Sequence, residues 1–166
     1  MFYNKKFKMS KKYNPIGLDA KKSEKLQEEL NDILATYHIY YQNLRGFHWN
    51  ITGNNFFELH IKFEELYNDA LIKIDAIAER ILTLGGTPLY TFSDYIKRAA
   101  FHEVSKIMTD IDTINMVVSN IGSIIALERK AVKLAQEAED EGSITLLTDD
   151  ISEKEKLVWM FNAWLK

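Results

Sequence analysis

The chain contains no cysteine, which excludes disulfide bonds, thiolate metal sites and thiol nucleophiles together. Proline and glycine are also scarce, with two and seven residues among 166, so long uninterrupted helices are possible. No apolar run approaches the roughly 20 residues that a membrane span needs, and no apolar signal segment precedes a cleavage site. These absences indicate one cytoplasmic domain with no membrane association, large enough to form a core without disulfides or a structural metal.

Charge is unevenly distributed along the chain, although the net charge is only −3. Five lysines precede the first acidic residue, Asp19; they are Lys5, Lys6, Lys8, Lys11 and Lys12. The rest of the chain holds 16 basic and 24 acidic residues, a net charge of −8. We therefore expect residues 1–18 to form a flexible lysine-rich arm and residues 19–166 to form the folded domain. The arm either contacts phosphates, as a DNA-binding arm would, or serves as a solubilising tail.

Four long segments carry apolar residues at alternating spacings of three and four, which is typical of amphipathic helices. They cover about residues 23–50, 55–84, 105–139 and 144–165. Asn55 and Glu58 resemble a capping box at the start of the second segment, and Gly85 and Gly86 mark its end. A connection of roughly 20 residues follows, in which residues 93–100 could form a short helix. With no strand signal, the pattern predicts an all-α four-helix bundle in which this connection crosses over.

The second segment has one face more than a bundle helix needs. On a helical wheel, one stripe is apolar and a second is charged and predicted to be solvated; the second contains Glu58, Lys62, Glu65, Asp69, Lys73 and Arg80. A third sector mixes polar and apolar residues; it contains His60, Ile61, Glu64, Leu71, Ile72, Asp75, Ala78, Glu79 and Leu82. This mixed sector is typical of a surface that meets another protein.

The polar residues of the mixed sector form two pairs at i,i+4 spacing: His60 with Glu64, and Asp75 with Glu79. Imidazole and carboxylate ligands suit iron or manganese. His60 and Asp75 are 15 residues apart, roughly 22 Å along a helix, so one straight helix cannot bring both pairs to one ion. Two antiparallel copies related by a two-fold axis can. The alternative is that the acids form a solvated face and that His60 is an interface histidine.

A family resemblance extends this interpretation. The stretch from His48 to Gly53, followed at fixed spacing by polar residues and by Leu84, Gly85 and Gly86, closely resembles the Dps mini-ferritins. Their ferroxidase signature is a histidine, a second histidine 12 residues later, an acid at 16, Asp at 27 and Glu at 31. In this sequence these offsets fall on His48, His60, Glu64, Asp75 and Glu79 without an insertion. The resemblance implies a ferritin-like four-helix bundle with a short extra helix between the second and third helices.

The resemblance also implies the ligand roles. Asp75 and Glu79 of one subunit, with His48 of the partner subunit, would hold the first of two irons, and His60 and Glu64 of the partner subunit would hold the second, with Glu79 bridging. Many family members have Asp at the position of Glu64. The extra methylene of Glu64 would either turn a water-mediated ligand into a direct one or loosen the second site.

Three further sets of residues have both an ordinary and a functional interpretation. Trp49 is a packing residue or, by resemblance, an electron donor near the iron. Asp140 and Glu141 belong to a charged turn or, by resemblance, line an iron-uptake pore at a three-fold axis. The arm lysines either contact DNA or remain in solvent.

The function that this resemblance implies is iron storage and protection from oxidative stress. It would be a ferroxidase that oxidises Fe(II), preferably with hydrogen peroxide, inside a hollow shell of twelve subunits. An alternative is a nucleoid protein that binds DNA and has secondary iron chemistry. A cage without iron chemistry would be favoured by the loss of His60 or Asp75, and both are present.

Overall fold

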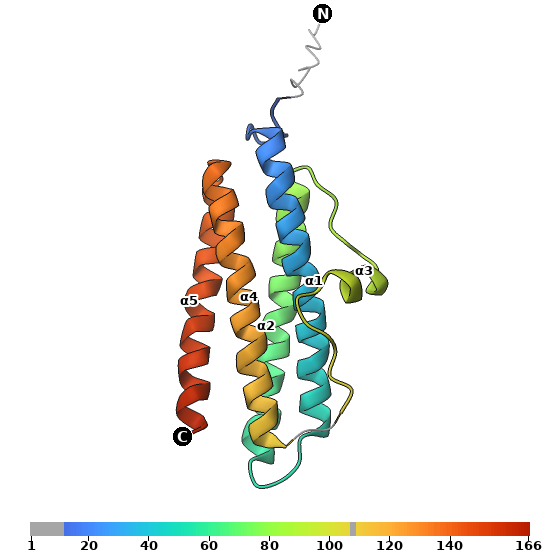
Figure 1. Ribbon diagram of the computed structural model, residues 1–166, viewed down its shortest axis with the longest axis vertical. Helices are drawn as coiled ribbons and strands as arrows, with labels where there is room; N and C mark the ends of the chain where they lie inside the picture. The colour runs from blue at the N-terminus through green and yellow to red at the C-terminus, as the bar shows by residue number, and fades with distance from the viewer. Residues whose placement is uncertain (1–11, 107–108) are drawn as a thin grey trace, which may run out of the picture.

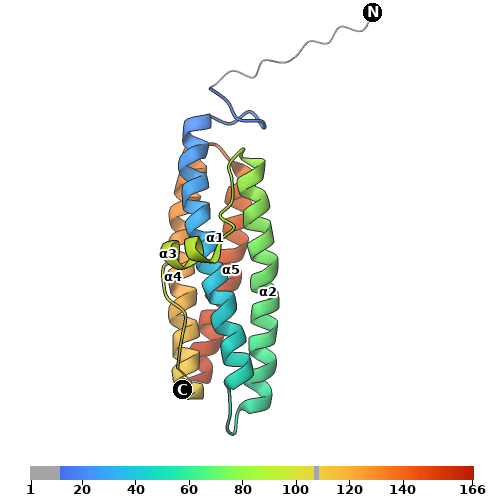
Figure 2. The same cartoon turned by 90° about the vertical axis from the view of Figure 1, so that its right-hand side faces the viewer.

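The structure is a computed structural model and describes residues 12–106 and 109–166. Five helices follow in order: α1 (Ala20–Asn50), α2 (Phe56–Thr83), α3 (Phe92–Arg98), α4 (Asp110–Glu137) and α5 (Glu141–Trp164). The four long helices lie side by side as a bundle, and α3 lies outside it against α1 (Figures 1 and 2). In the described residues there is no strand, so the prediction of an all-α ferritin-like bundle with a short extra helix is confirmed.

The connection between α2 and α4 determines the topology. It runs the length of the bundle, with α3 partway along, so that α2 and α4 point in the same direction (Figure 1). The sequence predicted this crossover from the length of the connection. Gly85 begins it with a φ of 87°, a conformation that side chains with a Cβ rarely adopt, and it lies against the ring of Pro15.

Side-chain caps begin most of the helices. Asp19, Thr91, Thr109 and Asp140 each accept a hydrogen bond from the backbone N–H three residues later. Asn55 occupies the same position at α2 but makes no such bond, because its Nδ2 donates to Asp110 Oδ2 at 2.7 Å. The prediction of a capping box at Asn55 is therefore wrong. The amide instead ties the start of α2 to the start of α4.

The core consists of the apolar stripes of the four long helices. Its largest fully buried side chains include Tyr37, Phe63, Leu26, Leu30, Ile81, Ile114, Ile121 and Ile124. Helix α4 is long and apolar enough to cross a membrane by length and composition alone. Its most apolar side chains face α1 and α5, as in the core helix of a bundle.

The charged stripe of α2 is only partly solvated, which corrects the sequence-based expectation. Helix α5 packs beside it and leaves Lys73 and Arg80 with less than a fifth of their side chains exposed. Lys73 Nζ lies 3.2 Å from Asp150 Oδ1, and Arg80 binds the Asp140 carboxylate and the Ser143 hydroxyl. A helical wheel cannot show this, because the angle around one helix does not reveal where a distant helix docks.

Residues 12–18 pack on the bundle instead of extending from it. The buried Asn14 accepts hydrogen bonds from the backbone N–H groups of Ile16 and Leu18 and donates to the carbonyl oxygen of Leu84 at 3.2 Å. The sequence-based boundary at residue 18 therefore comes too late for this segment. Lys12 lies over the ring of Tyr13, while the arm lysines Lys5, Lys6, Lys8 and Lys11 lie outside the described residues.

Candidate metal centre

His48, near the end of α1, and His60, in the first turns of α2, form a stacked pair. Their ring centroids are 3.7 Å apart and their planes differ by 18°. His48 Nδ1 lies 2.7 Å from the backbone oxygen of His60, and His60 Nδ1 lies 2.9 Å from the backbone oxygen of His48. The turn between α1 and α2 thus brings together two residues that are 12 positions apart in the sequence.

This reciprocal arrangement determines which nitrogen of each ring is free. A carbonyl oxygen can only accept a hydrogen bond, so each neutral ring carries its proton on Nδ1. Each Nε2 is then left with its lone pair, which is the form that binds a metal ion. The pair is therefore oriented as two nitrogen ligands.

Tyr67 lies beside the pair and was not identified from the sequence. Its ring packs edge-on against His48 at 5.4 Å and against Tyr41 at 6.1 Å. Burial and the negative charge of the adjacent Glu64 carboxylate raise the pKa of Tyr67. Tyr67 follows His60 by seven residues, or two helical turns, and that spacing was the available signal. Tyr67 thus connects a predicted ligand, Glu64, to the histidine pair.

Asp75 and Glu79 are exposed on the same helix, farther along α2. Asp75 follows His60 by 15 residues, and Glu79 follows Glu64 by 15 residues, which is roughly 22 Å at the rise of an α-helix. Within residues 12–106 and 109–166, no three histidine or carboxylate side chains converge as a metal site. The structure therefore brings His48 and His60 together, with Glu64 one turn away, and leaves Asp75 and Glu79 apart from them.

Large apolar side chains surround these groups on the outer face of α2. More than half of each side chain is exposed in a single chain; the residues are Phe57, Ile61, Leu71, Ile72 and Leu82. Apolar residues interleaved with potential ligands are typical of a surface that another protein covers. The mixed sector of the sequence is thus an unpartnered face of the bundle.

Trp49 is 57% exposed and lies next to His48 in the chain. Its ring stacks under the Arg45 guanidinium, with 4.5 Å between the charged carbon and the ring centroid. It therefore takes no part in the core of a single chain. His38 faces another direction, where it stacks on Tyr95 at 3.8 Å, as expected for a packing residue.

The two acids predicted for a pore differ in exposure. Asp140 is 2% exposed, and its carboxylate caps α5 while binding Arg80 and Ser143. Glu141 is exposed in the first turn of α5. The contacts of Asp140 occupy its carboxylate, which leaves Glu141 as the available acid of the two.

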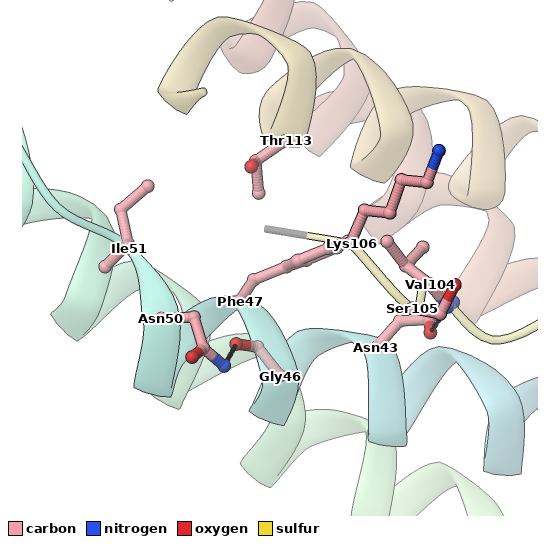
Figure 3. A pocket seen from close by; sticks show the side chains of 9 residues that line it. All are labelled: Asn43, Gly46, Phe47, Asn50, Ile51, Val104, Ser105, Lys106 and Thr113. Carbon is pink, nitrogen blue, oxygen red and sulfur yellow. Dashed lines mark hydrogen bonds between the residues drawn. The ribbon is translucent and has the colours of Figure 1, made fainter. Parts of the chain in front are cut away.

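A separate cavity of about 260 Å³ lies where α1 ends and α4 begins (Figure 3). Asn43, Asn50 and Thr113 contribute polar groups to its wall, and Lys106 is the charged residue among its described lining residues. None of the five predicted metal ligands lines it. This cavity has no feature of a metal site.

Comparisons with known proteins agree with this architecture. The family model for the ferritin-like domain matches residues 24–166. The DNA protection during starvation protein of Porphyromonas gingivalis is 41% identical over 156 residues, covering 94% of this chain and 98% of that protein. The crystal structure of the DPS protein from Vibrio cholerae O1, described as a member of the ferritin-like diiron-carboxylate superfamily, superposes with a TM-score of 0.92 and 46% identity, covering 95% of this chain and 99% of that one.

A Dps protein from Bacillus brevis superposes with a TM-score of 0.86 at 34% identity, covering 88% of this chain and 98% of that one. Relatives of this similarity and coverage show more than a shared fold. The chain belongs to the Dps family of ferritin-like proteins.

Proposed function

We propose that this chain is a ferroxidase subunit that binds two Fe(II) ions at each two-fold interface between copies. The observation that carries the proposal is the stacked pair of His48 and His60. Both Nδ1 atoms are held by carbonyl oxygens, which leaves both Nε2 atoms as potential ligands beside the apolar outer face of α2, with His48 itself 8% exposed. The carboxylate pair that would complete the site lies at the other end of the same helix.

The donor set fits iron as a substrate. Imidazole nitrogen and carboxylate oxygen bind Fe(II) well, and carboxylates stabilise the Fe(III) that oxidation produces. In an antiparallel pair, Asp75 and Glu79 of one chain meet His48 of the partner subunit at the first iron. His60 and Glu64 of the partner subunit face the second iron, with Glu79 between the two. Tyr67 would hold the Glu64 carboxylate in place.

Two irons at one site suit a two-electron oxidant. Oxidation of two Fe(II) to two Fe(III) supplies the two electrons that, with two protons, reduce one hydrogen peroxide to two waters. No hydroxyl radical is then released. We expect peroxide to oxidise bound iron much faster than dioxygen, and stopped-flow rates that are equal or faster with dioxygen would contradict this expectation.

A closed shell of twelve subunits would store the ferric product as mineral in its interior. Exposed acids at three-fold axes draw cations inward, because a pore lined with one sign of charge concentrates the opposite sign. Glu141 is our candidate for this role. Its replacement by glutamine should slow iron uptake into the shell without changing iron binding at the interface.

Complementation tests the shared site directly. One variant carries His48→Ala and His60→Ala, and the other carries Asp75→Ala and Glu79→Ala. Each damages both sites of its own dimer, whereas a mixed dimer keeps one site with intact histidines facing intact carboxylates. Co-refolded mixtures should recover up to one working site per mixed dimer. Assembled mixed dimers that remain as inactive as both parents would refute the shared site.

DNA binding is a second candidate, because relatives are named for DNA protection during starvation and the arm carries five lysines. The body beyond the arm has a net charge of −8 and repels phosphate. We therefore propose weak binding through the arm, which salt abolishes. Mobility shifts with and without residues 1–12 test this, and tight binding by the shortened chain would assign DNA to another surface.

A further inference from the structure

A second cluster of ionisable side chains lies inside the bundle, away from the interface. Tyr37 of α1, Glu128 of α4, and Asp150 and Lys154 of α5 are each at most 5% exposed. We refer to the three oxygen-bearing residues, Tyr37, Glu128 and Asp150, as the interior cage. Burying a charge costs free energy unless the charge is paired, so the contacts of these side chains need a physical explanation.

The Lys154 ammonium lies against the interior cage and is closest to Asp150. Its Nζ lies 2.6 Å from Asp150 Oδ1, 4.0 Å from Glu128 Oε1 and 4.8 Å from the centroid of the Tyr37 ring. The Tyr37 hydroxyl donates to Asp150 Oδ2 and lies 3.2 Å from Glu128 Oε1. The ammonium thus has carboxyl oxygens from α4 and α5 beside it and the ring of Tyr37 from α1 against it.

Glu128 shows that the interior cage could accept more positive charge than one ammonium provides. Its Oε2 is buried and has no hydrogen-bond donor next to it in the described part of the chain. Burial, together with a hydrogen bond to Asp150, raises the pKa of Glu128 to about 9. At neutral pH this carboxyl group therefore keeps a proton that a divalent ion would displace.

Asp150 carries the negative charge of the cluster. Burial alone would raise its pKa, but the hydrogen bond from Glu128 and the Lys154 ammonium hold the pKa well below its usual range. Lys73 of α2 adds a second ammonium at 3.2 Å from Asp150 Oδ1, at the edge of the cluster. Asp69 and Glu153 face Lys73 from the solvent side.

We propose that Lys154 is the built-in cation of the interior cage and that it keeps divalent metal ions out of the bundle interior. Two carboxyl groups and a phenol at one point are oxygen ligands of the kind that Mn²⁺ and Fe²⁺ accept. An ammonium ion that the chain itself supplies cannot diffuse away, so it competes with any free ion. Lys154 is therefore a specificity-determining residue: it leaves metal to sites outside the bundle. The occupancy of the interior cage does not depend on the proposed ferroxidase activity.

The sharpest test is Lys154→Met, because methionine has the length of lysine up to the ε position, with a neutral sulfur at the δ position, and lacks the ammonium. The measurement uses a parent chain in which His48, His60, Asp75 and Glu79 are alanine, so that interface binding does not contribute to the count. Mn²⁺ titration followed by electron paramagnetic resonance gives the number of bound ions per chain. We expect the parent to bind none inside the bundle and Lys154→Met to gain one.

A matched control adds Asp150→Asn to Lys154→Met, which removes the anionic ligand and should return the count to that of the parent. Mn²⁺ binding to Lys154→Met should also tighten as the pH rises toward 9, because the ion displaces the Glu128 proton. A folded Lys154→Met chain that binds no more Mn²⁺ than its parent would overturn the proposal.

If Lys154→Met leaves the chain unfolded without metal, the cause is that the buried Asp150 has lost its closest cation and keeps only Lys73 at the edge of the cluster. In that case Mn²⁺ should restore the helical circular dichroism signal, because an ion that binds only the folded chain stabilises it. Failure of Mn²⁺ to restore helicity, at concentrations that saturate ordinary oxygen-ligand sites, would equally count against the interior cage.

Discussion

The interior cage and the histidine pair both gather metal-binding side chains, yet they differ in what completes them. In the interior cage, Lys154 supplies the cation within the same chain, and the side chains are almost fully buried. At the histidine pair, the rings of His48 and His60 are fixed by backbone carbonyls, but the remaining ligands lie roughly 22 Å away along α2. The first cluster is closed within the fold, and the second is open.

This difference predicts which substitutions change stability and which change metal binding. A closed cluster of buried charges is strongly destabilised by the removal of one partner, because the other charge is left unpaired in the core. The histidine pair makes no ion pair in the described residues, so the loss of one ring leaves no unpaired charge in the core. Substitutions in the interior cage should therefore change unfolding, whereas substitutions at the histidine pair should change binding.

The largest expected effect is that of Asp150→Ala. Lys154 would then be buried without its anionic partner, and the free energy of unfolding should fall by about 3–5 kcal/mol. Urea unfolding at fixed protein concentration measures the loss. Asp149→Ala removes an exposed carboxylate one residue earlier and should change the unfolding free energy by less than about 0.5 kcal/mol. A loss below about 1 kcal/mol for Asp150→Ala would show that the buried ion pair contributes little.

The next largest effect is a pH dependence that originates in Glu128. Its pKa is raised in the folded chain to about 9, from an ordinary value of 4.5. Between these values the folded chain holds a proton that the unfolded chain releases, so the unfolding free energy falls as the pH rises. The slope from this one group approaches about 1.4 kcal/mol per pH unit, and less if water reaches the site.

Glu128→Gln isolates this effect, since glutamine has the same shape and stays neutral at every pH. Urea unfolding from pH 5 to pH 8 should give a steeper decline for the natural chain than for the variant. All other titrating groups are common to both chains and cancel in the difference. Parallel curves would mean that Glu128 is ionised in the folded chain.

The bundle was predictable from sequence because its signal is local. Apolar spacing located every long helix; α4 begins five residues later than expected, at Asp110, and α5 three residues earlier, at Glu141. The predicted capping box at Asn55 does not form, because the Asn55 side-chain amide binds Asp110 on another helix. The prediction that Lys73 and Arg80 are solvated was wrong for a similar reason, because α5 covers the stripe that a single helix would expose to water.

The sites were predictable to different degrees. Four potential ligands were identified from their spacing on α2 and His48 from the family resemblance, but the reciprocal bonds of His48 and His60 require two helices to meet at a particular angle. The sequence did not predict the interior cage. Asp150 and Lys154 resemble an ordinary i,i+4 surface pair, and Glu128 resembles a solvated acid. Only the packing of α1, α4 and α5 shows that the three are buried together.

The smallest effect expected is that of Tyr67→Phe at the open pair. The ring would keep its edge-on contact with His48, so folding should not change, but Glu64 would lose the adjacent Tyr67 hydroxyl. Groups that orient a metal ligand typically alter affinity by about 10- to 100-fold, and an exposed carboxylate such as Glu64 belongs at the lower end. We expect about tenfold weaker Co²⁺ binding at the second position of the shared site and unchanged binding at the first.

Anaerobic titration followed by visible absorption resolves the two steps. Tyr90→Phe, which alters a tyrosine that is 81% exposed beside α3, is the matched control and should leave both steps unchanged. Equal affinities for the Tyr67→Phe variant and the natural chain would show that Glu64 is positioned by the metal itself and not by the tyrosine.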